Sequence, residues 1–211
     1  MIKILIADDH PIVREGLRQV IEKSPDMKVA GEALNGQEVL DRVFAEPWDV
    51  LILDFSMPGK SGFDVIQELH REKPKLPILV LSMHPENELA PRLLKAGAAG
   101  YLNKESAPKE LVNAILKVHQ GGRYVSAELA EKLAEDLGRG AGKKPHELLS
   151  DREYQVLLRI AAGRTPHEIA GEFSISVKTV RTYRERIMQK LSVKNDVEIT
   201  RYAIDNGLVS R

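Results

Sequence analysis

The sequence predicts an α/β domain followed by a smaller all-α domain. In the first 120 residues, short apolar runs alternate with segments whose apolar residues recur at helical spacing. Parallel neighbours need crossover connections, so this alternation predicts a doubly wound, five-stranded parallel sheet in the order 2-1-3-4-5 with helices on both faces. From residue 147 onward only helical periodicity and capping signals remain, which predicts four helices without a sheet.

The strands of the first domain are expected where apolar runs end at polar residues. Leu51, Ile52 and Leu53, followed by Asp54, are typical of a strand that is buried on both faces. The five strands are expected at residues 2–7, 27–33, 49–54, 77–82 and 100–102. The five helices are expected at residues 11–21, 37–45, 63–69, 86–96 and 111–118.

Polar side chains follow these strands at the edge where ligands collect in open α/β sheets. Asp8 and Asp9 follow the first strand, Asp54 ends the third, Ser82 ends the fourth, and Lys104 follows the fifth. Three carboxylates in one crevice require a counter-charge, and oxygen ligands with a partly hydrated shell suit Mg²⁺. Two simpler interpretations stay open at this point: Asp54 starts a turn, and Asp8 caps the following helix.

The same cluster has the chemistry for phosphoryl transfer. A carboxylate beside a metal ion, a lysine and a hydroxyl can attack phosphorus and hold the resulting acyl phosphate, and Asp54 is the natural nucleophile. A phosphatase or hydrolase that uses Asp54 is the competing enzyme hypothesis. Because no second acid stands two residues after Asp54 to act as a general acid, we expect at most slow turnover.

Composition excludes several other functions. Cysteine is absent, so disulfides, thiolate catalysis and the usual zinc sites are excluded, and a reducing cytoplasm is the expected location. No apolar run approaches the roughly 18 residues of a membrane span, so no membrane partner is expected. From residue 143 onward there are 13 Lys and Arg against 9 Asp and Glu, and before it 18 against 22. The basic C-terminal part favours an anionic partner.

A linker is expected between the domains, at residues 123–146. Ser126 is a helix-capping residue, and Leu129, Leu133 and Leu137 follow at spacings of four, which predicts one amphipathic helix over residues 126–137. The glycine-rich stretch at 138–145 predicts a flexible tether that lets the domains reorient.

The second domain has the signals of a helix-turn-helix protein. Ser150 and Glu153 have capping-box spacing, and Gly163 ends the helix that they start. Thr165 caps a short second helix, and two further helices are expected at residues 177–191 and 193–206. Two helices joined by a tight turn, the second of them rich in cationic residues, are typical of a helix-turn-helix motif.

At about 100° per residue, the long helix separates an apolar side from a polar side. Val180, Ile187 and Leu191 fall on the inner side. Of the residues opposite, Arg181, Thr182 and Glu185 suit base edges in the major groove. Contacts to phosphates, or elsewhere along the groove, are expected from Lys178, Thr179, Tyr183, Arg184, Arg186, Gln189 and Lys190. The alternative is a merely solvated basic helix.

Residues 1–120 resemble the receiver domain of two-component response regulators, a flavodoxin-like fold. The resemblance rests on Asp8-Asp9, Asp54, Met57-Pro58-Gly59, Ser82, Ala98-Ala99-Gly100-Tyr101 and Lys104. It implies that Asp54 accepts phosphate from a histidine kinase. It also implies that Asp8, Asp9, Asp54 and the Ser56 backbone carbonyl bind Mg²⁺. Ser82 and Tyr101 would then rearrange together on phosphorylation, and Lys104 would contact the phosphoryl group.

Residues 148–209 resemble the LuxR-type DNA-binding domain. The matching segments are Leu149-Ser150-Asp151-Arg152-Glu153, Glu168-Ile169-Ala170, Ser176-Val177-Lys178-Thr179-Val180 and Ile187-Met188-Gln189-Lys190-Leu191. Nearly the whole chain thus resembles a NarL/FixJ-type response regulator: a receiver at 1–122, a linker at 123–146 and a DNA-binding domain at 147–211.

For such a protein we expect double-stranded DNA and a histidine kinase as partners. We also expect activation through a homodimer to which the last helix contributes Val197, Ile199, Tyr202 and Ala203. A DNA binder with a vestigial, phosphorylation-independent receiver is the remaining alternative.

Overall fold

The computed structural model describes residues 1–83, 86–131 and 144–209, and the side chains of 87 and 88 are left aside. Chain contacts divide it into two compact units, Met1–Ala130 and Glu131–Arg211. Each unit is described by itself. No helix in the described ranges is both long and apolar enough to cross a membrane.

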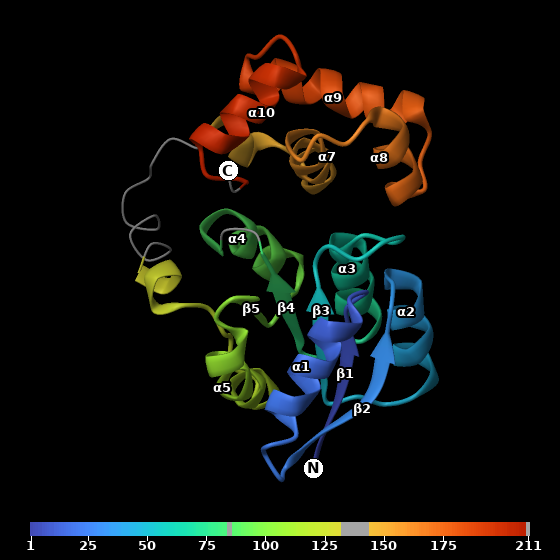
Figure 1. Cartoon of the computed structure of the whole chain (residues 1–211), viewed down its shortest axis with the longest axis vertical. Coiled ribbons are helices and arrows are strands. Elements are labelled where there is room, and N and C mark those ends of the chain that lie inside the picture. Colours follow the sequence, from blue (N-terminus) through green and yellow to red (C-terminus); the bar gives the residue numbers. More distant parts are fainter. Residues whose placement is uncertain (84–85, 132–143, 210–211) are drawn as a thin grey trace. The chain divides into compact units, whose positions relative to one another are not determined.

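The first unit is the expected doubly wound α/β domain (Figure 1). Its sheet is entirely parallel in the order β2-β1-β3-β4-β5, which confirms the predicted topology. The strands are β1 (Ile2–Ala7), β2 (Met27–Ala33), β3 (Val50–Asp54), β4 (Ile78–Ser82) and β5 (Gly100–Asn103). The helices are α1 (Pro11–Ile21), α2 (Gly36–Ala45), α3 (Gly62–Glu72), α4 (Glu86–Ala96) and α5 (Ala107–His119).

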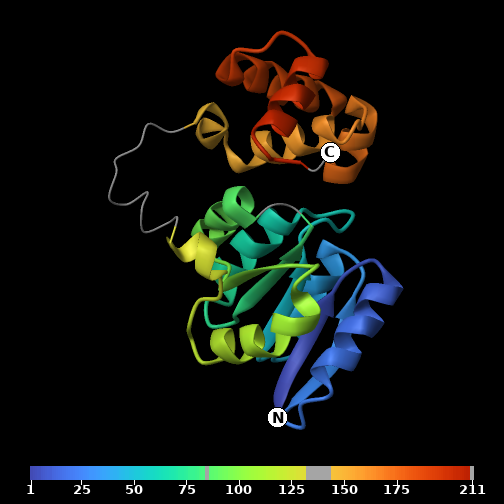
Figure 2. The ribbon, with the colours of Figure 1, turned by 60° about the vertical axis from the view of Figure 1, so that its left-hand side comes forward.

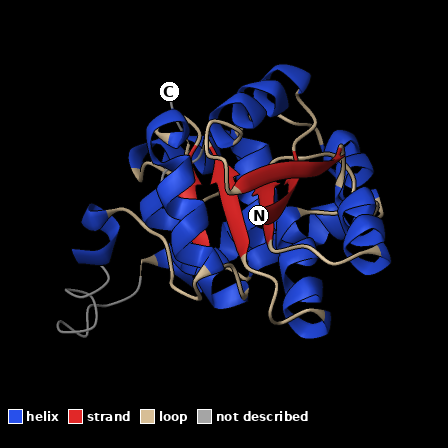
Figure 3. Ribbon diagram, turned by 90° about the horizontal axis from the view of Figure 1, so that it is seen from below, coloured by secondary structure: helices blue, strands red, loops and turns tan. Residues whose placement is uncertain are grey.

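Successive side chains along each buried strand point to opposite faces of the sheet, so an apolar core forms on each face. Ile4, Ile6 and Ile52 face α1 and α5, which pack against each other. The opposite face is covered by α2, α3 and α4, and α3 contacts both of the others. Figures 2 and 3 show helices on both sides of the strand layer. The centre of the sheet is therefore closed to solvent, and only the strand ends are open for chemistry.

The chain after α5 returns to the edge of the sheet, which the sequence did not predict. Tyr124 forms a parallel bridge with Gly100, and Tyr101 N–H donates to the Tyr124 carbonyl at 2.9 Å. A helical stretch begins at residue 127, after Ser126, and is described as far as 131. The predicted continuation of this helix to Leu137 and the glycine-rich tether up to residue 143 lie outside the described residues.

The second unit is a bundle of helices, as predicted. A short 3₁₀ turn, η1 (Pro145–Leu148), precedes α7 (Asp151–Ala161), α8 (Pro166–Phe173), α9 (Val177–Leu191) and α10 (Asp196–Asp205). Both expected caps are present, since Ser150 and Thr165 each form a capping box with the glutamate three residues later. The last helix begins three residues later than predicted because the Asn195 side chain accepts from Glu198 N–H and so fixes the start.

The turn between α8 and α9 is built by serines. Ser174 ends α8 in the left-handed region at φ +52°, and Ser176 caps α9 by accepting from Thr179 N–H. Val180, Ile187 and Leu191 of α9 are buried, which confirms the predicted inner side of that helix.

We expect Gly36→Ala to destabilise the first unit and Gly16→Ala to stabilise it. A Cβ at Gly36 would overlap the backbone carbonyl of Lys60, whereas a Cβ at Gly16, within α1, meets nothing within 4 Å. The expected changes in the free energy of unfolding are a loss of about 1–3 kcal/mol at Gly36 and a gain of about 0.5–1 kcal/mol at Gly16. Denaturant unfolding followed by fluorescence of Trp48, the single tryptophan, measures both in the first unit. Equal effects of the two substitutions would contradict this packing.

Candidate functional site

The sheet brings the chemistry-bearing residues to one edge. Ala7 pairs with Leu53, so the residues that follow, Asp8 and Asp54, leave adjacent strands. Lys104 N–H donates to the Ser82 carbonyl at 3.0 Å, which places the end of β4 beside the residue that follows β5. The strand order alone thus gathers side chains that are up to 96 residues apart in the chain.

Lys104 lies between two buried carboxylates. Its Nζ is 2.7 Å from Asp8 Oδ2 and 2.9 Å from Asp54 Oδ2. The side chains of Asp8 and Asp54 are only 1% and 2% exposed, and that of Lys104 is 15% exposed. Because these ion pairs are largely withdrawn from water, salt screens them much less than it screens surface pairs.

Burial governs the ionisation of this cluster. Burial raises the pKa of Asp54, an effect that the nearby Lys104 amine opposes and the negative charge of Asp8 reinforces. Burial alone would lower the pKa of Lys104, but hydrogen bonds and charges from Asp8 and Asp54 outweigh it, so the net shift is upward. Lys104 is therefore held as a cation, and Asp54 is a more basic carboxylate than a solvated aspartate.

The backbone around the cluster holds its carboxylates in place. Ser56 N–H donates to Asp54 Oδ1 at 3.1 Å from the turn that follows β3. His10 N–H donates to Asp8 Oδ1 at 2.8 Å, and Arg14 donates to the Asp8 carbonyl. Asp8 thus holds the residue that precedes α1 and also faces Lys104, but the interpretation of Asp8 as the helix cap is wrong, because His10 is the N-cap residue and no described side chain caps α1.

The acidic edge has the donor set of a divalent-cation site. One ligand atom from each of Asp8, Asp9, His10 and Asp54 lies within 4.8 Å of the others. Asp9 Oδ1 is inaccessible to solvent and receives no hydrogen bond from a described residue, whereas Asp54 Oδ2, also inaccessible, has the Lys104 amine 2.9 Å away as its charged partner. A single lysine faces three carboxylates, so the cluster retains negative charge that a hard cation such as Mg²⁺ would neutralise.

Ser82 and Tyr101 are in contact beside this edge. Both are buried, and burial raises the pKa of Tyr101 to about 12, although its side-chain hydrogen bond with Ser82 acts the other way. The Tyr101 ring therefore points inward and is linked to the residue expected to contact a phosphoryl group.

Two features of the first unit were missed or misjudged from the sequence. His10 follows the acidic pair and is expected from the sequence as a solvated neighbour of the site; its side chain is 65% exposed, as expected, but its Nδ1 lies 2.8 Å from Asp9 Oδ1. The contacts that fasten the linker were not foreseen: Ser126 N–H donates to Glu86 Oε1 at 2.8 Å, and Tyr124 Oη donates to Glu110 at 2.7 Å. No periodicity marks such contacts, because each joins residues from different elements. His84, the other histidine expected near the pocket, lies outside the described residues.

On α9, most of the expected DNA-facing residues lie on the side away from the core. Lys178, Arg181, Glu185, Arg186 and Gln189 are exposed, and Thr179, Thr182 and Tyr183 are half-buried. Two cations are engaged within the unit instead. Lys190 Nζ lies 2.6 Å from the buried carboxylate of Glu153, and Arg184 pairs with Asp196 at 2.5 Å. The sequence predicts phosphate contacts for both, because a helical projection contains no neighbouring helix.

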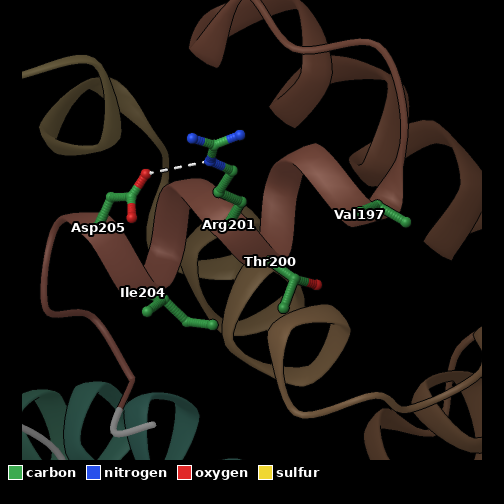
Figure 4. A pocket seen from close by; sticks show the side chains of 5 residues that line it. All are labelled: Val197, Thr200, Arg201, Ile204 and Asp205. Carbon is green, nitrogen blue, oxygen red and sulfur yellow. Dashed lines mark ion pairs between the residues drawn. The ribbon is translucent and has the colours of Figure 1, made fainter.

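The last helix presents a different surface from the one expected. Of the four residues predicted to contribute to a dimer contact, Ile199 and Ala203 are fully buried, and Tyr202 hydrogen-bonds with the buried His146 at 3.0 Å. Val197 is 78% exposed. A shallow recess on the outer side of α10 is lined by Val197, Thr200, Arg201, Ile204 and Asp205 (Figure 4).

Comparison with known proteins identifies the class of both units. The family described as the response regulator receiver domain matches residues 4–116, and the family of bacterial regulatory proteins of the luxR family matches residues 147–203. A receiver joined to a LuxR-type domain defines a response regulator. The chain belongs to the NarL/FixJ-type response regulators.

Its relatives share this arrangement over their full length. Response regulator UvrY of Escherichia coli (strain K12) is 38% identical over 209 residues, covering 99% of this chain and 96% of UvrY. Response regulator GacA of Pseudomonas syringae pv. syringae is 36% identical over 210 residues, covering 99% and 98%. A structure of RcsB from Salmonella typhimurium has a TM-score of 0.79 at 29% identity, covering 99% and 98%. RcsB from Salmonella enterica serovar Typhimurium, bound to promoter P1flhDC with the phosphomimetic BeF₃⁻, has a TM-score of 0.75 at 30% identity, covering 97% and 98%.

We expect Asp54→Asn to stabilise the first unit at neutral pH in the presence of a chelator. In the folded state burial raises the pKa of Asp54 above its ordinary value, so the stability that the protonated form contributes is lost as pH rises through the folded pKa. Asparagine cannot ionise, so it avoids this loss, and we expect a gain of about 1–2 kcal/mol at pH 7.

The gain should shrink as pH falls towards 4, because wild-type Asp54 then becomes neutral as well. Urea unfolding followed by Trp48 fluorescence from pH 7 to pH 4 measures this dependence. The exposed Asp26→Asn is the control and should show no gain at any pH. A variant less stable than wild type at pH 7 would contradict a costly buried charge at Asp54.

Proposed function

We propose that this response regulator is switched by phosphorylation of Asp54 and that its C-terminal domain binds DNA to control transcription. The observation that supports the proposal most directly is the convergence of Asp8 and Asp54 on the Lys104 amine at 2.7 and 2.9 Å. An aspartate held in this way, at the open end of a sheet, is equipped as a phosphoacceptor.

The proposed reaction is an in-line transfer from a phosphohistidine of a histidine kinase. One Asp54 carboxylate oxygen attacks phosphorus, the P–N bond to the imidazole breaks, and the new P–O bond forms an acyl phosphate. Lys104 donates to a phosphoryl oxygen, and the Ser82 hydroxyl donates to another. Mg²⁺, bound by Asp8, Asp9, Asp54 and the Ser56 carbonyl, would supply charge neutralisation on the phosphoryl oxygens.

Ser82 and Tyr101 support a route for the signal. When the Ser82 hydroxyl turns to the phosphoryl group, its hydrogen bond with Tyr101 is lost, and the buried ring is released from one of its restraints. Tyr101 N–H also donates to the Tyr124 carbonyl, so a change at Tyr101 acts directly on the segment that leads to the second domain.

For the second domain, we propose that α9 enters the major groove and that two copies of the chain bind two half-sites. The relatives support this proposal, because RcsB structures are described as bound to promoters and as dimers bound to DNA. Arg181, Thr182 and Glu185 would contact base edges. Contacts to phosphates, or to other parts of the groove, would come from Lys178, Thr179, Tyr183, Arg186 and Gln189. Lys190 is assigned to the ion pair with Glu153 rather than to DNA. We also propose a cytoplasmic location, because the proposed partner of the second domain is DNA.

Membership of the response regulators favours a switch over a hydrolase. Any catalysis would then be limited to slow autophosphorylation and autodephosphorylation at Asp54, because the residue two positions after it is a serine and not an acid.

We expect incubation with acetyl phosphate and Mg²⁺ to add one phosphoryl group to the wild-type protein and none to Asp54→Ala. Intact-protein mass spectrometry measures the uptake, and Asp26→Asn should be labelled like wild type. Lys104→Ala should lose most of the uptake, because the transferred group loses its counter-charge. Labelling of Asp54→Ala would contradict the assignment. Rapid release of phosphate over many turnovers would favour the hydrolase instead.

We expect phosphorylation to increase both dimer formation and retention of promoter DNA. Size-exclusion chromatography and filter binding, with and without acetyl phosphate, measure the two effects. If Asp54→Ala binds DNA as tightly as the phosphorylated wild-type protein does, the result would favour a vestigial receiver that acts without phosphorylation.

We expect Arg181→Ala and Lys178→Ala to weaken DNA binding in different ways. Loss of a base contact at Arg181 should cost about 1–3 kcal/mol and relax the preference at one position of the site. Loss of a phosphate contact at Lys178 should weaken all sequences alike and reduce the salt slope by about 1. Duplexes selected by the wild-type protein from a random library provide the measurement, with the exposed Lys23→Ala as control. Identical behaviour of the two variants would argue for a merely solvated basic helix.

A further inference from the structure

His10 contacts the acidic edge in a way that the proposed phosphoryl transfer does not use. Its Nδ1 lies 2.8 Å from Asp9 Oδ1 and 3.3 Å from Asp8 Oδ1. The ring is largely exposed on its other sides, with 65% of the side-chain surface accessible. The nitrogen nevertheless lies close to both carboxylates of the acidic edge.

The contact between His10 and Asp9 lacks the geometry of a hydrogen bond. Asp9 Oδ1 is inaccessible to solvent and receives no hydrogen bond from any described residue, although Nδ1 is only 2.8 Å away. Neighbouring ligands of an octahedral ion with bonds of about 2.1 Å are separated by about 3 Å. The distances from His10 Nδ1 to the two carboxylate oxygens are close to that separation.

The remaining candidate ligand atoms of the cluster lie close to the same point. A carboxylate oxygen of Asp54 belongs to the same group of candidate ligands, and Asp54 Oδ2 also lies 2.9 Å from the Lys104 amine. Asp8 divides its two oxygens, with Oδ2 beside Lys104 and Oδ1 beside His10. Lys104 therefore neutralises one side of Asp8 and leaves the side that faces His10 for another cation.

The backbone fixes His10 in this position. His10 is the N-cap residue of α1, with extended φ and ψ of −93° and 111°, and Pro11 follows it in the first turn. Its N–H donates to Asp8 Oδ1 at 2.8 Å. The imidazole is thus attached to a constrained corner next to both aspartates, so little conformational freedom is lost when the ring takes a place at the site.

We infer that His10 supplies an imidazole nitrogen to the divalent-cation site beside Asp8, Asp9 and Asp54. This inference rests on the proposed function insofar as it needs the acidic edge to bind a cation. Carboxylates suit Mg²⁺, whereas an imidazole nitrogen raises the affinity for first-row transition ions, which follow the Irving–Williams order. The site then binds Mn²⁺ or a later first-row transition ion more tightly than Mg²⁺, and His10 is responsible for this difference in affinity.

The test uses Mn²⁺ alone with the full-length protein. The EPR signal of free Mn²⁺ gives the affinity, and competition with Mg²⁺ gives the affinity for that ion. We expect His10→Gln to weaken Mn²⁺ binding about tenfold and to change Mg²⁺ binding less than about twofold. His119→Gln, on the exposed end of α5, is the matched control and should change neither affinity.

A direct readout comes from pulsed EPR of the bound Mn²⁺. Coupling to a histidine nitrogen is expected in the wild type. This coupling should change when the protein is produced with ¹⁵N-labelled histidine. It should persist in His119→Gln and vanish in His10→Gln. The isotope separates an imidazole ligand from the Lys104 amine and from backbone nitrogen.

The outcomes separate this inference from the proposed function. If Mn²⁺ binds without histidine coupling, or binds His10→Gln as tightly as wild type, His10 is not a ligand and the acidic site stands without it. Tighter binding to His10→Gln would show that the ring competes with the ion as a charged partner of Asp9. If wild type does not bind Mn²⁺, or if binding is unaffected by Asp9→Asn and Asp54→Asn, the cation site of the proposed function fails as well.

Discussion

The buried ammonium group of Lys104 is the constraint on which the first unit depends. Asp8 and Asp54 are almost completely withdrawn from water, and neither could remain ionised there without a compensating charge. One lysine cannot neutralise a cluster that also includes Asp9, and the remaining negative charge is what makes the edge a candidate cation site.

A continuous set of contacts leads from this cluster to the start of the linker. Ser82 lies beside Lys104 and hydrogen-bonds Tyr101, and Tyr101 pairs through its backbone with Tyr124. Two residues later, Ser126 N–H is held by Glu86, the first residue of α4. The proposed coupling therefore needs no long-range movement within the first unit, because Tyr101 and the start of the linker lie at the same edge of the sheet.

The second unit shows how tertiary contacts select among the cations of one helix. Helical periodicity separated the inner from the outer side of α9 correctly, since both follow from a repeat of 3.6 residues. It could not show that Glu153 of α7 takes Lys190 or that Asp196 of α10 takes Arg184. The same limit applies to α10, where Tyr202 was predicted at a surface and instead bonds the buried His146.

The sequence by itself determined the order of the elements, the parallel sheet and the address of each polar residue at a strand end, because apolar runs, crossovers and caps are local or topological signals. Only the tertiary structure decided which oxygen of Asp8 faces Lys104, that His10 turns towards Asp9, and that the chain after α5 returns to Gly100. These features depend on side-chain direction and on contacts between distant segments, which a pattern of residue types along one chain does not encode.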